Sequence, residues 1–304
     1  MTLLIVVTYV VLGGLVFILL AALMVSRKNR CVEIRDTMLA PEELEKHAVE
    51  LARNHPVGKT ARGLQWLIRR MNDNFSFISD VFKSLNVDVK AFFPTAPAAE
   101  WLLDNFYIIE EQAKLIRRSL ARGHYSRLPV LKKGYLKGYP RVYAIALELI
   151  AHTDGRIDEK ALTGFINAYQ SQALLSMGEL WAVALMLRIA LIENTRYICE
   201  AILKSQQEWH RAEKLADILA VQDFNELNTA GIINEQLSGE GSLTSSFIEH
   251  LLQKLRKQGK AVSTVTYLLD KMLKEYNSST EIETNLEHQL QASRQVSIGN
   301  TITG

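Results

Sequence analysis

The feature that most constrains the fold of this chain is an uncharged apolar run near its start. Residues 3–25 contain no charged side chain, and Thr8 is the most polar residue among them. A run of about 20 apolar residues is long enough to cross a bilayer as a helix. A cleavable signal peptide usually has a basic leader and a shorter apolar core, whereas no Lys or Arg precedes this run. The sequence therefore predicts an N-terminal transmembrane helix.

Basic residues directly after this run predict its orientation. Positive charge collects on the cytoplasmic side of a membrane helix, so the N-terminus is expected outside and the body of the chain in the cytoplasm. The next most apolar stretch, residues 182–192, is interrupted by Arg188 and is predicted to be a buried helix of the body. A single-pass protein follows from this pattern. The flanking basic residues are Arg27, Lys28, Arg30 and Arg35.

The scarcity of breaking residues favours helices over a many-stranded sheet. The 304 residues include only 16 Gly and 6 Pro, and 48% are hydrophobic, enough for a core. No run with two-residue alternation is long enough to require a strand. The predicted fold class is all-α, with an N-terminal transmembrane helix followed by a cytoplasmic multi-helix domain. Cys31 and Cys199 are too far apart to suggest a disulfide framework, and Cys199 is expected in the core.

Local signals predict where several helices begin. Pro41, followed by two glutamates, is typical of a first helical turn, and residues 92–97 break the chain before the next long helix. Helical pattern resumes after Pro140. Asp158 can cap the following helix, and residues 176–179 have capping-box spacing.

The remaining helices are predicted from apolar periodicity. One is expected at about 60–84 and a long apolar one from 180 to about 203, followed beyond 207 by amphipathic segments with polar turns. A linker is expected at 238–242, and the last helices near 244–257, 262–276 and 280–297. The predicted domains are a transmembrane anchor with a basic cytoplasmic flank (1–36), a helical scaffold domain (37–237) and a C-terminal helical segment (238–304).

A segment without acidic residues is the least ordinary part of the body. Between residues 112 and 147 there is no Asp or Glu, and tyrosines alternate with basic residues. Such a segment could bind anionic lipid headgroups, dock on an acidic neighbouring domain, bind a nucleotide or nucleic acid, or be a solvated loop. We favour lipid or domain contact and expect no nucleic acid. The candidate surface residues are Arg117, Arg118, Arg122, Arg127, Lys132, Lys133, Lys137 and Arg141.

Residues that could bind a metal occur at one turn, but their spacing is uninformative. His152, Asp154 and Asp158 offer suitable ligand types, although the spacing matches no established site and Asp154-Gly155 is ordinary turn chemistry. The sequence therefore predicts neither a metal site nor a cofactor.

Candidate acid/base carboxylates have simpler explanations in helices. Glu179 fits the capping box, while Glu110, Glu111 and Glu193 fit charged helix faces. No Gly-rich phosphate loop and no nucleophile motif is present. No catalytic residue is predicted.

Several segments resemble, in order, the N-terminal region of cyclic β-1,2-glucan synthases. The similarity covers about residues 98–200 and returns near the C-terminal end. The segments are AEWLLDNF (99–106), EEQ (110–112), GYPRVY (138–143), LELIAHTDG (147–155), GELWA (178–182), LIEN (191–194) and QVSIGN (295–300).

The resemblance implies a very large bacterial inner-membrane enzyme that polymerises glucose from UDP-glucose in β-1,2 linkage. In that family this helical region precedes the glycosyltransferase domain, whose D-x-D and Q-x-x-R-W motifs do not occur in this sequence. The chain is therefore expected to be a membrane-anchored scaffold portion of such an enzyme, a fragment or truncated frame. Its expected partners are the lipid bilayer and a glycosyltransferase domain in cis.

Two other functions compete with this interpretation. One is a free-standing single-pass membrane adaptor without enzymatic activity. The other is a small hydrolase or transferase formed by the helical body, which would require converging carboxylates or histidines that the sequence does not reveal.

Overall fold

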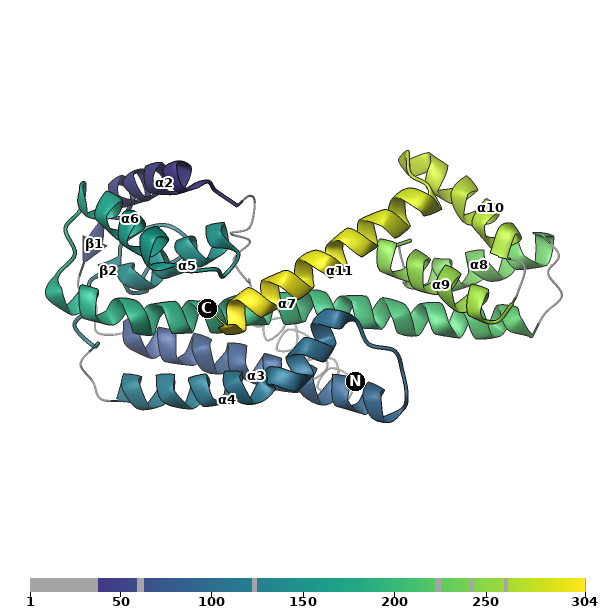
Figure 1. Cartoon of the computed structure of the whole chain (residues 1–304), viewed down its shortest axis with the longest axis horizontal. Helices are drawn as coiled ribbons and strands as arrows, with labels where there is room; N and C mark the ends of the chain where they lie inside the picture. Colours follow the sequence, from purple (N-terminus) through teal and green to yellow (C-terminus); the bar gives the residue numbers. More distant parts are fainter. Residues whose placement is uncertain are drawn as a thin grey trace, which may run out of the picture. The chain divides into compact units, whose positions relative to one another are not determined.

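The computed structural model describes residues 38–58, 63–121, 125–221, 226–240, 243–259 and 262–303 (Figure 1). Helices make up most of these residues, so the all-α prediction is confirmed. The predicted membrane helix at 3–25 lies outside the described residues. Among the helices that are described, none combines the length and the apolar character that a membrane crossing requires.

From residue 37 on, the chain forms one compact unit. The boundary predicted at 237/238 falls inside α8. In chain order the elements are α2 (Pro41–Asn54), β1 (Val57–Gly58), α3 (Gly63–Lys90), α4 (Pro97–Ala121), β2 (Val130–Leu131), α5 (Arg141–Thr153), α6 (Glu159–Gln170), α7 (Met177–Ala220), α8 (Glu226–Glu240), α9 (Ser245–Lys257), α10 (Val262–Leu273), the 3-10 turn η1 (Lys274–Tyr276) and α11 (Thr280–Thr303).

The predicted helix starts are confirmed at several positions. α2 begins at Pro41 and α4 at Pro97, and the Asp158 carboxylate accepts the Ala161 N–H at 2.7 Å to cap α6. At the start of α7, Ser176 and Glu179 form the predicted capping box. These starts are set by local chemistry, which the sequence carries directly.

Helix α7 is much longer than predicted and connects two hydrophobic cores. Its 44 residues continue past the expected end near 203 because its buried face continues, through Leu215 and Leu219. Leu180 and Leu187, near its start, pack on a core shared by α2, α5 and α6. Its last turns pack on a second core built with α8, α9 and α10. Figure 1 shows α7 running beneath both groups of helices.

Helix α11 returns along α7 in the opposite direction. Ser205 on α7 donates to Glu287 near the start of α11, and Asn194 on α7 donates to Thr301 near its end. The helix therefore ends beside the middle of α7 (Figure 1).

A short strand pair joins two connections that are distant in sequence. β1 and β2 are antiparallel, with Val57 opposite Leu131. The chain then turns back at Gly138, where φ is 88° and a Cβ would overlap the indole ring of Trp66. The sequence prediction contained no strand here, because a two-residue strand has no alternation to detect.

A buried ion pair lies where α3 and α5 meet α7. Glu193 of α7 accepts from Arg70 Nε at 2.7 Å, from the Tyr143 hydroxyl at 2.6 Å and from Asn74 Nδ2 at 3.0 Å. The prediction that Glu193 fits a charged helix face is wrong, because its side chain is only 8% exposed and pairs with Arg70 inside the unit. Burial raises the pKa of Glu193, but the bonds from Arg70, Tyr143 and Asn74 outweigh it and leave the pKa below its usual value.

We predict that Glu193→Gln strongly destabilises the fold. The substitution keeps the shape of the side chain but leaves the Arg70 guanidinium, only 17% exposed, without its counter-charge. Breaking a buried pair in this way costs about 3–5 kcal/mol. Urea denaturation followed by circular dichroism measures the change. The control is Asp80→Asn, which removes an exposed partner of Lys83 (67% and 72% exposed) and should leave the midpoint nearly unchanged. Equal midpoints for both variants would contradict the assignment.

Candidate functional site

The candidate basic surface divides into exposed and buried members. Arg117 and Arg118 lie exposed on α4, and Arg122 lies outside the described residues. Arg117 also donates to Asn72 at 2.9 Å, and its guanidinium lies 4.7 Å from the ring centroid of Phe75. Of the described residues between α4 and α5, the exposed basic ones are Arg127, Lys132, Lys133 and Lys137.

Arg141 is not on that surface. Its side chain is 6% exposed, and its Nε and Nη2 atoms donate to the two carboxylate oxygens of Glu179 at 2.8 and 2.7 Å. Nη2 also donates to the Leu174 carbonyl oxygen. A buried guanidinium requires such a counter-charge, and the Glu179 side chain that completes the capping box of α7 provides it. The expectation that Arg141 contacts lipid or another domain is therefore corrected.

The three residues considered as metal ligands from the sequence do not converge. Asp158 caps α6. Asp154, in the left-handed conformation at the end of α5, accepts two bonds from the Ser297 hydroxyl at 2.7 and 2.8 Å. Only His152 points into a cluster of ligand-type side chains. Its partners there are residues that the sequence interpretation did not select.

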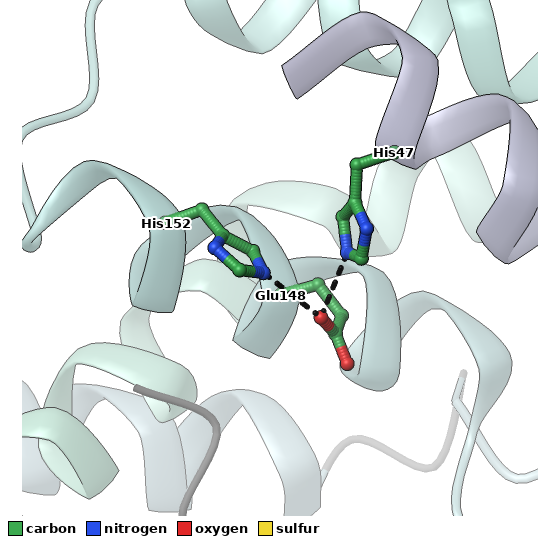
Figure 2. Close-up of side chains that lie close together, drawn as sticks. All are labelled: His47, Glu148 and His152. Atoms are coloured by element: carbon green, nitrogen blue, oxygen red, sulfur yellow. Dashed lines mark hydrogen bonds and ion pairs between the residues drawn. The ribbon is translucent and has the colours of Figure 1, made fainter. Parts of the chain in front are cut away.

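That cluster joins α2 to α5 and consists of His47, Glu148 and His152 (Figure 2). The Nε2 atom of His47 lies 3.0 Å from Glu148 Oε2, and the Nε2 atom of His152 lies 3.6 Å from the same oxygen. Figure 2 shows both contacts ending on one carboxylate oxygen. The two imidazole rings meet edge to face, with centroids 4.6 Å apart. We call this group the His–Glu–His cluster.

The second oxygen of Glu148 has a separate partner. The hydroxyl of Tyr135 donates to Oε1 at 3.0 Å. Since this bond fixes the orientation of the carboxylate, Oε2 is directed at both histidines. Tyr135 thus acts on the cluster through Glu148 and not by contact with the imidazoles.

The carboxylate of Glu148 is held ionised. Burial alone would raise its pKa, but hydrogen bonds with His152, His47 and Tyr135 lower the pKa to about 2. The side chain is 11% exposed, so its charge is satisfied by these partners and little by water.

Solvent reaches the cluster from the side of α2. The His47 side chain is 28% exposed, and His152 lines a cavity of about 350 Å³ together with Glu45 of α2 and Arg156. Two imidazoles and one carboxylate at such an opening are donors that a transition-metal ion can use.

Part of this cluster was detectable in the sequence. Glu148 and His152 are spaced i, i+4 and both lie in α5, which places them on one face. The sequence interpretation placed His152 in the turn after this helix, so it did not recognise the pair. His47 is 101 residues away from Glu148 and carries no comparable signal.

A second histidine of α2 lies close by in a different environment. His55 follows the last turn of α2, and its Nδ1 atom lies 3.1 Å from the Tyr169 hydroxyl. Burial, partly offset by the charge of Glu148, lowers the pKa of His55 to about 4.

Comparison with known proteins supplies the family relationship. No family model matches the chain. The cyclic beta-(1,2)-glucan synthase NdvB of Rhizobium meliloti (strain 1021) is 30% identical to it over 213 residues. The chain is related to the cyclic β-1,2-glucan synthases. The resemblance found in the sequence is thereby confirmed. The match covers 70% of this chain but only 7% of the length of that synthase.

We predict that His55 makes the fold sensitive to mild acid. Between pH 6.5 and 4 the imidazole is neutral in the folded chain and protonated in the unfolded chain. The unfolded state therefore binds more protons, and stability falls as the pH is lowered through this window, by at most about 3 kcal/mol. His55→Gln should remove this component. Its size is measured as the difference between the urea-denaturation stabilities of the wild type and the variant at a series of pH values.

The matched control is His288→Gln, which removes an imidazole whose side chain is 60% exposed. If His55→Gln and wild type lose stability in parallel from pH 6.5 to 4, the assigned pKa shift is wrong.

Proposed function

We propose that this chain is a membrane-anchored helical scaffold region of a cyclic β-1,2-glucan synthase-like glycosyltransferase, which makes glucan from UDP-glucose. The observation that carries the proposal is the 30% identity over 213 residues to a cyclic beta-(1,2)-glucan synthase. In this proposal, catalysis takes place in another domain of such an enzyme, and the helical unit positions that domain.

The internal construction of the unit suits a scaffold. Two buried pairs, Arg70–Glu193 and Arg141–Glu179, fix α3 and α5 on α7. Buried ion pairs need exact geometry to offset desolvation, so they favour one arrangement of the helices. A rigid arrangement is what a region that positions a neighbouring domain requires.

Exposed apolar side chains near the start of α7 offer a surface for that neighbour. Leu174, Met177 and Trp181 are 80%, 62% and 76% exposed. Large exposed apolar groups that lie near one another commonly mark contact sites. We assign them, with Trp101 of α4, to contact with the transferase domain.

The anchor in this proposal is the apolar run at residues 3–25, which would hold the unit at the cytoplasmic face of the inner membrane. The exposed bases Arg118, Lys132, Lys133 and Lys137 would then contact anionic lipid headgroups or the neighbouring domain.

Immunoprecipitation from native membranes tests the enzyme assignment. An antibody against residues 98–200 is used to precipitate detergent-solubilised membranes, and incorporation of labelled UDP-glucose into β-1,2-glucan is assayed in the precipitate. We expect glucan synthesis in the precipitate and a band far above 34.3 kDa. A band near 34.3 kDa without synthase activity would overturn the proposal in favour of a membrane adaptor.

A charge-reversal variant tests the lipid contact. We predict that Lys132→Glu, Lys133→Glu and Lys137→Glu together weaken binding of the detergent-purified full chain to anionic vesicles at least tenfold, because each basic group contributes about 1 kcal/mol at such a surface. The measurement is the amount of detergent-solubilised chain that binds to immobilised phosphatidylglycerol vesicles at low salt. The chain need not be reconstituted into the vesicles beforehand.

The control carries the same change of charge at exposed lysines elsewhere, Lys204→Glu, Lys271→Glu and Lys274→Glu. Equal loss in both variants would show that net charge alone matters and would contradict a specific basic surface.

A further inference from the structure

We propose that the His–Glu–His cluster binds a divalent transition-metal ion, Zn²⁺ being the ion that its donors fit best. The three ligand atoms come from two helices that are far apart in sequence, and all lie within 4.8 Å of one another. This site is independent of the glucan-synthase proposal, because it rests only on His47, Glu148 and His152.

Two of the three separations are close to those of a tetrahedral site. Ligand atoms at about 2.0–2.1 Å from Zn²⁺ stand about 3.3 Å from one another in a tetrahedron. The His47–Glu148 and His152–Glu148 contacts, at 3.0 and 3.6 Å, lie on either side of that value. The remaining separation, between the two imidazole nitrogens, is no more than 4.8 Å and must shorten when an ion binds. Of the two imidazoles, His47 is the less enclosed, at 28% exposed against 12% for His152.

The donor types select the class of ion. Two imidazole nitrogens and one carboxylate oxygen suit Zn²⁺ and similar ions, whereas Mg²⁺ and Ca²⁺ prefer oxygen ligands throughout. Three protein ligands leave a fourth position for water. Of the three, His152 also lines the cavity beside α2.

Tyr135 supplies the outer support that such sites need. Its hydroxyl bond to Glu148 Oε1 leaves Oε2 as the single metal-binding oxygen. Outer partners of this kind orient a ligating carboxylate and commonly change metal affinity 10- to 100-fold when removed. Tyr135 is therefore a positioning residue, not a ligand.

A bound ion would link two helices, because its ligands come from both α2 and α5. Glu148 and His152 occupy successive turns of α5, while His47 belongs to α2. A bound ion would cross-link α2 to α5 in addition to their shared apolar core. Metal binding thus stabilises the attachment of α2, the first helix that the structure describes.

Zinc titration of the full 304-residue chain tests the proposal. The chain is purified in mild detergent, stripped with EDTA and titrated with Zn²⁺ in competition with a chromophoric chelator. We expect one Zn²⁺ per chain, a rise in Tm of several degrees on adding Zn²⁺, and a visible absorption spectrum typical of four-coordinate Co²⁺ when Co²⁺ replaces it.

Four variants separate a metal site from an ion-pair cluster. His47→Gln and Glu148→Gln should each lower Zn²⁺ affinity at least 100-fold and abolish the Tm rise, and Tyr135→Phe should lower affinity about tenfold. The control is His210→Gln, which removes a histidine paired with Asp88 at 3.0 Å and leaves the cluster intact. It should bind Zn²⁺ like wild type.

Two outcomes would overturn the proposal. One is the absence of stoichiometric Zn²⁺ binding by the folded wild-type chain. The other is equal Zn²⁺ affinity in wild type, His47→Gln and Glu148→Gln, which would place the ion elsewhere. Circular dichroism of each variant establishes that it is folded, and Tyr135→Phe, the mildest change, keeps the test valid if a ligand variant unfolds. Glucan synthesis is not measured, so this result and that of the immunoprecipitation are independent.

Discussion

The arrangement of the helical unit depends on charges that α7 buries instead of exposing. A carboxylate placed in a core must be paired and hydrogen-bonded to remain ionised, because burial disfavours its charge. Glu179 and Glu193, at two levels of the same helix, each receive a guanidinium from a different neighbour, α5 and α3. Each contact ties one neighbouring helix to α7 at one level, because a buried ion pair needs good geometry to offset the desolvation of its charges.

Local chemistry explains why some of the fold could be predicted. The starts at Pro41, Asp158 and Ser176 depend on residues within one turn, and the structure confirms each. The predicted end of α7 was wrong because no local residue marks where the helix stops. The helix continues as long as its apolar face finds partners, and those partners are supplied by α8 to α10. Tertiary contacts of this kind are not encoded near the residue they affect.

The site shows the same division between local and distant information. The i, i+4 pair on α5 was readable in principle, whereas His47 reaches it only through the packing of α2. Arg141 shows that a basic residue in an acid-free segment is not necessarily at the surface. Arg141 is buried because it pairs with Glu179, which is distant in sequence.

The last turn of α5 has a mechanical consequence. His152 at this turn faces α2, and Asp154, two residues later, receives the hydroxyl of Ser297 from α11. Directly after it, Gly155 lies so close to Thr301 that an added Cβ would come within 2.7 Å of its Oγ1 atom. The earliest and the latest of the described helices are thus attached within a few residues of each other. A change in the last turn of α5 therefore acts on the attachment of both helices at once.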